Sequence, residues 1–323
     1  MKDFLQPDTL DSNSTSISNQ PDFKPTEISS VIDGIPKDMG LPRPSHPTLV
    51  GPERVLSRTD TSFTTETARR SKRPFQIVLY DVRLSQAEPG HTEHLWAPKI
   101  WRIRFILNFK RLPYQTVWLE PQDVERTLRQ IGAPPSSQRS DGRPVYTLPV
   151  IMDRARNVHQ PVILANTNTI AEYLESTYPA RPVFPEGARA VQTLFVHFIQ
   201  EVFSKPLLPI MVPLSHQQLP ERTRDHLREG GPLVGPQREQ AWQAVREQFD
   251  FLAMIMDKNI GDGEGDGVVT MGREVSYADF AICSVLIWIE RMAPHDGWSR
   301  VREWNGGRWR KLYERCSHYM DEL

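Results

Sequence analysis

Residues 145–151 have the sequence VYTLPVI, and the rest of the fold can be arranged around this stretch. Its run of apolar and β-branched residues predicts a strand. A second apolar run follows at 161–164, after a turn near Arg156 and Asn157. Two strands in such close succession predict an antiparallel pair, and the pattern at 167–178 predicts a helix directly after them.

The segment before this pair predicts two strands that alternate with two helices. Residues 75–80 form a nearly continuous apolar run, which is typical of a buried central strand. A helix is expected from Pro98, because proline suits the first helical position and apolar residues follow at helical spacing. Residues 114–119 predict the second strand and 123–131 a polar helix. The complete order, β-α-β-α-β-β-α, is the thioredoxin-like arrangement.

The remainder of the chain predicts only helices. A proline-containing linker at 179–189 precedes apolar patterns of helical period at 190–203 and 238–257. Residues 277–292 are apolar on nearly every side, so they predict a fully buried central helix. The expected fold is therefore an α/β N-terminal thioredoxin-like domain followed by an all-α C-terminal domain.

The start of the chain differs from both domains. Residues 1–72 are rich in Ser, Thr, Pro and Asp and show no sustained apolar period. Such a segment cannot bury enough surface to offset its ordering entropy, so we expect a disordered tail. The expected organisation is this tail, a thioredoxin-like domain at 73–178, the linker, and a helical domain at 190–323.

Composition excludes several classes of function. The formal net charge is −1, which gives no basic field for nucleic acid. The basic run at 69–73 is expected to be a solvated hinge, with a nuclear address as the alternative. No apolar run reaches the roughly 18 residues of a membrane span, and the first residues lack a secretory signal. With only Cys283 and Cys316, no disulfide framework is implied. We expect a soluble cytoplasmic protein without nucleic-acid or membrane partners.

Three motifs stand in the same order as these elements: TLPVI at 147–151, NTNTIAEYLE at 166–175 and SYADF at 276–280. In the last, Ser276 and Asp279 have the spacing of a helix capping box. Together the motifs and the domain order resemble the glutathione S-transferase family. Segments at 96–110, 112–120 and 304–309 resemble its fungal, etherase-related branch more closely. The resemblance covers residues 75 to about 320.

The resemblance implies that glutathione is bound by four residues. In this family a proline like Pro149 is cis, which lets the backbone of Leu148 pair with the cysteinyl part of glutathione; the alternative is an ordinary proline at a strand edge. Thr167 falls where the family has a serine that caps the next helix and holds the γ-glutamyl carboxylate. Asn166 replaces a commoner acidic residue, so it loses the charge attraction for the α-amino group of glutathione.

The family pattern breaks at Ala97. Related sequences have a serine there, whose hydroxyl donates to the glutathione thiolate, and alanine has nothing to donate. We expect substitutes from the positive end and free amides of the helix at Pro98, from the Lys99 cation, or from Thr92 or His94 in the preceding loop. Lys99 is the preferred candidate, the alternative being a merely solvated side chain.

Two segments resemble metal sites without completing them. His91 and His94 lie in a loop that offers no third ligand. Residues 262–267 copy the first half of a calcium loop, but its twelfth position is Arg273 instead of a bidentate glutamate. We therefore expect no metal site and interpret 262–267 as a flexible acidic turn.

Three functions are consistent with these features. The first is a glutathione-dependent transferase, or a lyase or etherase relative, that acts on an apolar or aromatic electrophile, with fungal secondary metabolism as its setting. The second is a non-catalytic ligand-binding protein, and the third a docking module. The family is commonly dimeric, so a homodimer is also expected. Candidates for the second pocket wall, most of them expected to serve as core, are Phe198, Val202, Pro206, Leu207, Met211 and His216.

Overall fold

The computed structural model describes residues 76–82, 97–219, 231–261 and 265–320, all within one compact unit of the chain. The expected tail at 1–72, the loop that carries Thr92 and His94, and the first part of the acidic turn at 262–267 lie outside these residues.

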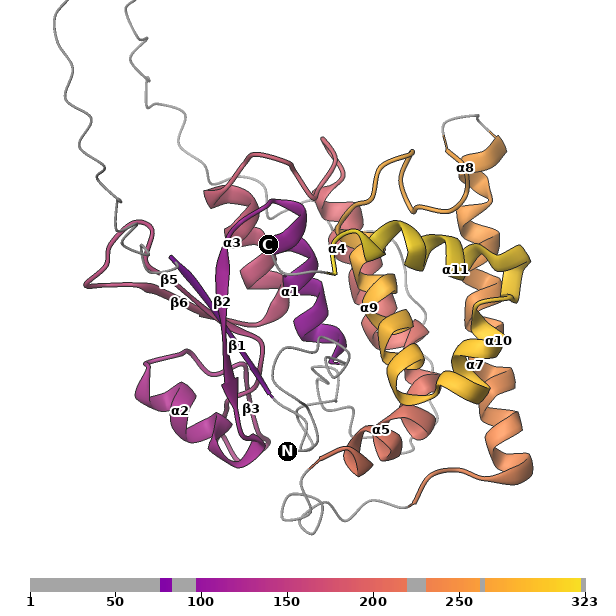
Figure 1. Ribbon diagram of the computed structural model, residues 1–323, viewed down its shortest axis with the longest axis horizontal. Coiled ribbons are helices and arrows are strands. Elements are labelled where there is room, and N and C mark those ends of the chain that lie inside the picture. Colours follow the sequence, from indigo (N-terminus) through magenta and orange to yellow (C-terminus); the bar gives the residue numbers. More distant parts are fainter. Residues whose placement is uncertain (1–75, 83–96, 220–230, 262–264, 321–323) are drawn as a thin grey trace, which may run out of the picture. The chain divides into compact units, whose positions relative to one another are not determined.

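A four-stranded sheet in the order β2-β1-β5-β6 is the centre of the N-terminal part (Figure 1). The strands are β1 (Ile77–Val82), β2 (Tyr114–Leu119), β5 (Val150–Asp153) and β6 (Val162–Ala165). β1 and β2 are parallel, and β5 is antiparallel to both β1 and β6, which confirms the predicted antiparallel pair. Every residue of β1 is buried, as expected of a central strand.

The stretch 145–151 does not form the single strand that its apolar run predicts. Its first residue belongs to β4 (Pro144–Val145), which pairs with β3 (Ser137–Gln138) in a separate two-stranded sheet. β5 begins only at Val150. The peptide between Leu148 and Pro149 is cis, as the resemblance implied. Proline has no N–H to give to a ladder, so the strand pattern is interrupted here.

Three helices complete the N-terminal part: α1 (Pro98–Phe109), the short α2 (Val124–Gln130) after a 3₁₀ turn at Pro121–Asp123, and α3 (Thr167–Thr177). α1 packs against α3 and also against α9 of the C-terminal part (Figure 1). Phe105 on α1 stacks on Phe280 of α9, with ring centroids 5.1 Å apart. α1 is therefore buried from Ile100 to Asn108, including Arg102 and Arg104.

The regular elements of the C-terminal part are all helices in its described residues. Its main helices are α4 (Arg189–Phe198), α5 (Leu208–Gln217), α7 (Gly235–Met256), α9 (Tyr277–Met292) and α11 (Trp304–Ser317), with shorter segments at α8 (Lys258–Gly261) and α10 (Ser299–Val301). α9 spans the predicted residues and begins with the predicted capping box, in which the N–H and Oγ of Ser276 each donate to Asp279 at 2.8 Å. No helix in the described ranges is long and apolar enough to cross a membrane.

The predicted helix at 190–203 changes its type part-way. It is α-helical to Phe198 and continues as a π-helix, η4 (Ile199–Phe203). The wider turn closes at Ser204, whose N–H and Oγ donate to the carbonyl oxygen of Ile199 at 3.0 and 2.7 Å. A short 3₁₀ turn, η5 (Lys205–Leu207), then leads into α5. Side chains beyond Phe198 consequently depart from the α-helical spacing on which the sequence prediction rests.

A buried lysine joins the end of α1 to the linker. The Nζ atom of Lys110 lies 2.6 Å from Glu175 Oε2 on α3, and the side chain of Lys110 is fully buried. Nζ also donates to three carbonyl oxygens where the linker begins, those of Tyr178, Ala180 and Arg181, at 2.9, 3.3 and 3.2 Å. One side chain thus fixes the path by which the chain leaves the sheet domain.

Candidate functional site

A small polar pocket, of about 320 Å³ including the space at its open mouth, lies at the start of α3. We call it the polar pocket, and it is lined by Lys99, Ser136, Thr147, Leu148, Pro149, Asn166, Thr167, Asn168 and Gln200. The structure therefore brings together all four residues predicted to bind glutathione, Leu148, Pro149, Asn166 and Thr167, and places Lys99 beside them.

The helix cap in this pocket is Asn166, so the expectation that Thr167 caps α3 is wrong. Asn166 has a positive φ of 71°. Its Oδ1 atom accepts hydrogen bonds from the N–H groups of Asn168 at 2.9 Å and Thr169 at 3.4 Å. Thr167 is instead the first helical residue, too far along the chain to reach those amides. Because two donors already use the amide oxygen of Asn166, it is a poor acceptor for an ammonium group.

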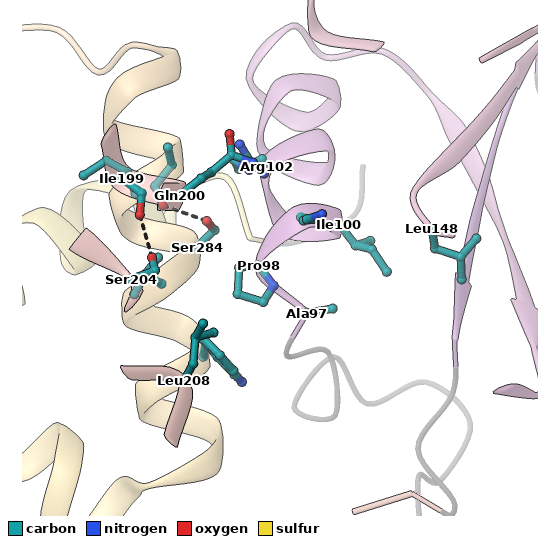
Figure 2. Close-up of a pocket in the computed structure, with 14 residues that line it drawn as sticks. Ala97, Pro98, Ile100, Arg102, Leu148, Ile199, Gln200, Ser204, Leu208 and Ser284 are labelled. Carbon is teal, nitrogen blue, oxygen red and sulfur yellow. Dashed lines mark hydrogen bonds between the residues drawn. The ribbon is translucent and has the colours of Figure 1, made fainter. Parts of the chain in front are cut away.

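A second, mainly apolar cavity adjoins the polar pocket and measures about 670 Å³ including its open mouth. Figure 2 shows its walls, which come from α1 on one side and from η4, α5 and α9 on the other. We call it the apolar cavity; its lining residues include Ala97, Pro98, Ile100, Leu148, Ile199, Leu208, Ala281, Val285 and Trp288. Lys99, Leu148 and Gln200 line both spaces, so the two are contiguous.

Family models of glutathione S-transferases match both parts of the chain. The N-terminal domain model matches residues 97–182 and the C-terminal domain model matches residues 190–319. This protein belongs to the glutathione S-transferase family. Among solved structures, glutathione transferase GSTFuA3 from Phanerochaete chrysosporium is 32% identical, with a TM-score of 0.66 over 76% of this chain and 97% of that one.

Two further relatives have the same family name. CsGST63524 of Ceriporiopsis subvermispora, solved in complex with glutathione, is 32% identical over 75% of this chain and 97% of that one, with a TM-score of 0.66. The glutathione S-transferase-like protein ustS of Aspergillus flavus is 25% identical over 248 residues, which are 72% of this chain and 87% of ustS.

In this member of the family, Ala97 precedes α1 in an extended conformation and is 8% exposed. Fewer free amides face the site than expected. Pro98 has no N–H, and the N–H groups of Ile100 and Trp101 donate to the carbonyl oxygen of Ala97 at 3.1 and 3.0 Å. The positive end of the helix dipole remains, with the Lys99 side chain in its first turn.

Four of the hydroxyl groups around the two spaces are already engaged as donors. Ser204 and Ser284 each donate to a backbone carbonyl of the preceding turn at 2.7 Å. Thr147 donates to Ser136 at 2.8 Å, and Ser136 donates to a strand carbonyl at 3.1 Å. Each hydroxyl hydrogen therefore stabilises the fold, and none of these four groups replaces the donor that Ala97 lacks.

None of the six candidate wall residues of the helical domain lines the apolar cavity: Phe198, Val202, Pro206, Leu207, Met211 and His216. Most of them are expected to serve as core instead. Leu207 and Met211 are fully buried in the core, whereas Val202 is 48% exposed. The neighbours Ile199, Gln200, Ser204 and Leu208 line the cavity instead. The π-helix shifts the register by one residue, and no pattern in the sequence signals that shift.

The described residues contain no group of three or more metal-binding side chains. Thr92 and His94, the remaining candidates for the thiolate site, lie outside the described residues.

Proposed function

We propose that this protein activates glutathione and joins it to an apolar or aromatic electrophile. The observation that carries the proposal is the contiguity of the two spaces at Lys99, Leu148 and Gln200. A thiol held in the polar pocket would have its sulfur at this boundary, next to a cavity suited to an apolar reaction partner.

The polar pocket has groups that match the parts of glutathione. The backbone of Leu148 offers hydrogen bonds to the cysteinyl part. The N-terminus of α3, at Thr167 and Asn168, suits the γ-glutamyl carboxylate, because helix N-termini favour anions. The relative CsGST63524 is solved in complex with glutathione, which supports glutathione as the ligand of this pocket. Asn166 contributes no charge toward the α-amino group, so we expect moderate affinity.

We infer that Lys99 is the catalytic residue that favours the thiolate. It is half-buried, lies in the first turn of α1 at the positive end of the helix dipole and lines both spaces. A cation near the sulfur favours the charged form and lowers the thiol pKa. Thr92 and His94 are the secondary candidates.

The test combines binding, ionisation and turnover. Calorimetry should detect glutathione binding, and ultraviolet titration of the complex should show a thiol pKa below that of free glutathione. A panel of aryl, benzyl and enone electrophiles should then be consumed in the presence of glutathione. If glutathione binds but its thiol pKa stays at the free value and no electrophile reacts, the enzyme proposal fails.

A second candidate function is a non-catalytic carrier of glutathione conjugates or apolar ligands. It is favoured by Ala97 and by the engagement of the surrounding hydroxyls. Tight binding of a preformed conjugate without any turnover would support it.

Within the first function, we propose an origin in the fungal etherase-related branch, a cytoplasmic location and a role in secondary metabolism. Similarity to GSTFuA3 of Phanerochaete chrysosporium and ustS of Aspergillus flavus supports only the fungal origin. Incubation with a β-aryl ether and glutathione separates a lyase, which releases a phenol, from a transferase that acts only on other electrophiles.

We also propose a homodimer that buries an exposed apolar patch on α4, η4 and α7. The patch consists of Val191, Leu194, Val202, Phe251, Met254 and Ile255, which are 43–69% exposed. Phe198 and Phe251 connect the helices, with ring centroids 6.0 Å apart. Sedimentation should show a dimer for the native chain and a monomer for Leu194→Glu; a native monomer at micromolar concentration overturns the proposal.

A further inference from the structure

The apolar cavity contains a buried positive charge that binding of an apolar molecule alone does not explain. Arg102 lies on α1, is 3% exposed and lines the cavity. Figure 2 shows it extending from α1 toward the helical domain. The described residues that line the cavity include two cations, Arg102 and Lys99, and no carboxylate. This charge balance favours a ligand that carries, or develops, negative charge.

Arg102 is held in place through a contact with Tyr277 of the helical domain. Burial raises the pKa of Tyr277, while the charge of Arg102 and a hydrogen bond from its side chain act in the opposite direction. The Tyr277 hydroxyl donates to Asn168 Oδ1 at 3.0 Å, at the wall of the polar pocket. A guanidinium has five N–H donors, so a bond to Tyr277 is compatible with another to a ligand. Arg102 is thus a preorganised donor.

The position of Arg102 along α1 suits a particular electrophile. It lies five residues beyond Ala97, a rise of about 7.5 Å along the helix. In a conjugated carbonyl compound, the oxygen is three bonds from the β-carbon that a thiolate attacks. With the sulfur near Ala97, the oxygen of such a compound would extend along α1 toward Arg102.

We propose that the preferred electrophile is an apolar α,β-unsaturated carbonyl compound and that Arg102 donates to its oxygen; this rests on the proposed glutathione-dependent function. The thiolate sulfur forms a bond to the β-carbon, and the π electron pair moves to the oxygen to give an enolate. Water then protonates the α-carbon, which balances the proton that the thiol released. Negative charge develops on the oxygen, where a buried cation stabilises it most.

The test compares two electrophiles that share a phenyl group. With 4-phenylbut-3-en-2-one, negative charge develops on the carbonyl oxygen. With benzyl chloride, the negative charge develops on the departing chloride. Arg102→Met should lower the ratio of kcat/KM for the enone to kcat/KM for benzyl chloride by about 100-fold. Arg102→Lys should lower the ratio less. Arg300→Met, which removes an exposed arginine outside both spaces, is the matched control and should leave the ratio unchanged.

The outcomes separate this inference from the function on which it rests. If the native protein conjugates benzyl chloride and the ratio is the same in Arg102→Met, the role of Arg102 is overturned while the proposed function stands. If the native protein binds glutathione but consumes neither electrophile, both fail.

A measurement on the native protein covers the case in which Arg102→Met does not fold. The inhibitor 4-phenylbutanoate should bind about tenfold more tightly than 4-phenylbutanamide, since only its carboxylate forms an ion pair with a buried guanidinium. The inhibition constants of the two compounds measure this difference. Equal inhibition by the two overturns the inference.

Discussion

The polar pocket and the apolar cavity share three residues but are built in different ways. The polar pocket comes mainly from two short segments of one domain, 147–149 and 166–168. The cavity gathers side chains from α1, η4, α5 and α9, which are far apart in the chain. The first can therefore be recognised from local motifs, whereas the second depends on how helices pack. Substrate choice can consequently change in the cavity without any change in the residues that hold glutathione.

The largest expected effect is a loss of stability at Lys110, which links α1 to α3 and to the linker between the two domains. Lys110→Met should lower the free energy of unfolding by about 3–5 kcal/mol, because it leaves the buried carboxylate of Glu175 and three carbonyls without their cation. Urea denaturation measures the loss. The double variant Lys110→Met with Glu175→Leu should lose less free energy of unfolding, because it leaves no buried carboxylate unpaired. A loss of about 1 kcal/mol or less in the single variant would show that the pair behaves like an exposed one.

Lys99→Met should affect both spaces, since Lys99 lies in their common wall. We expect kcat/KM to fall by about 10- to 100-fold and the pKa of bound glutathione to rise by about one unit, which corresponds to about 1.4 kcal/mol. Stopped-flow kinetics and ultraviolet titration check this. Lys311→Met, an exposed lysine on α11, is the control. An unchanged thiol pKa would remove Lys99 from the mechanism.

Ala97→Ser should act only where the apolar cavity meets the polar pocket. Its hydroxyl can accept from the first turn of α1 and donate to the sulfur, so we expect generic conjugation to increase by about tenfold, as a hydrogen bond to a charged group allows. Thermal denaturation should also show a small gain, because serine is a good N-cap residue. Ala97→Gly tests the cap without the hydroxyl. If the rate in Ala97→Ser equals that of the native protein, position 97 does not face the sulfur.

Asn166→Asp should have the smallest effect and should act on the polar pocket alone. Aspartate caps a helix as well as asparagine, so α3 should be retained. A new charge near the α-amino group should tighten glutathione binding about two- to fivefold, as expected of a partly exposed ion pair. Calorimetry at low and high salt measures this, and salt should weaken the gain. The KM for the electrophile is the internal control; a parallel change in it would mean that the pockets are not independent.

The elements that were predicted correctly have a strong local signal. α9 and β2 begin and end at the predicted residues. The capping box and the continuous apolar pattern mark α9, and a short run of residues with high β propensity marks β2. Five of the nine residues that line the polar pocket were named from the sequence, because they lie in or beside local motifs of the family: Lys99, Leu148, Pro149, Asn166 and Thr167. The π-helix at Ile199–Phe203 and the cap at Asn166 were missed, because both depend on backbone conformations that a side-chain pattern does not specify. Arg102 was missed because it lines the apolar cavity only once α1 packs against α9, and the sequence does not specify that packing.

The π-helix of η4 has a further consequence for how this protein can diversify. Its i→i+5 hydrogen bonding accommodates one residue more than an α-helical turn does, so deleting one residue within 199–203 would restore α-helical hydrogen bonding and leave the later side chains facing as they do now. Leu208 would keep its place in the wall of the apolar cavity, whereas the side chains of the π-helix itself, including Gln200, would be rearranged. One event in the length of the chain would thereby reshape the part of the apolar cavity that borders the polar pocket and leave the rest of the cavity intact.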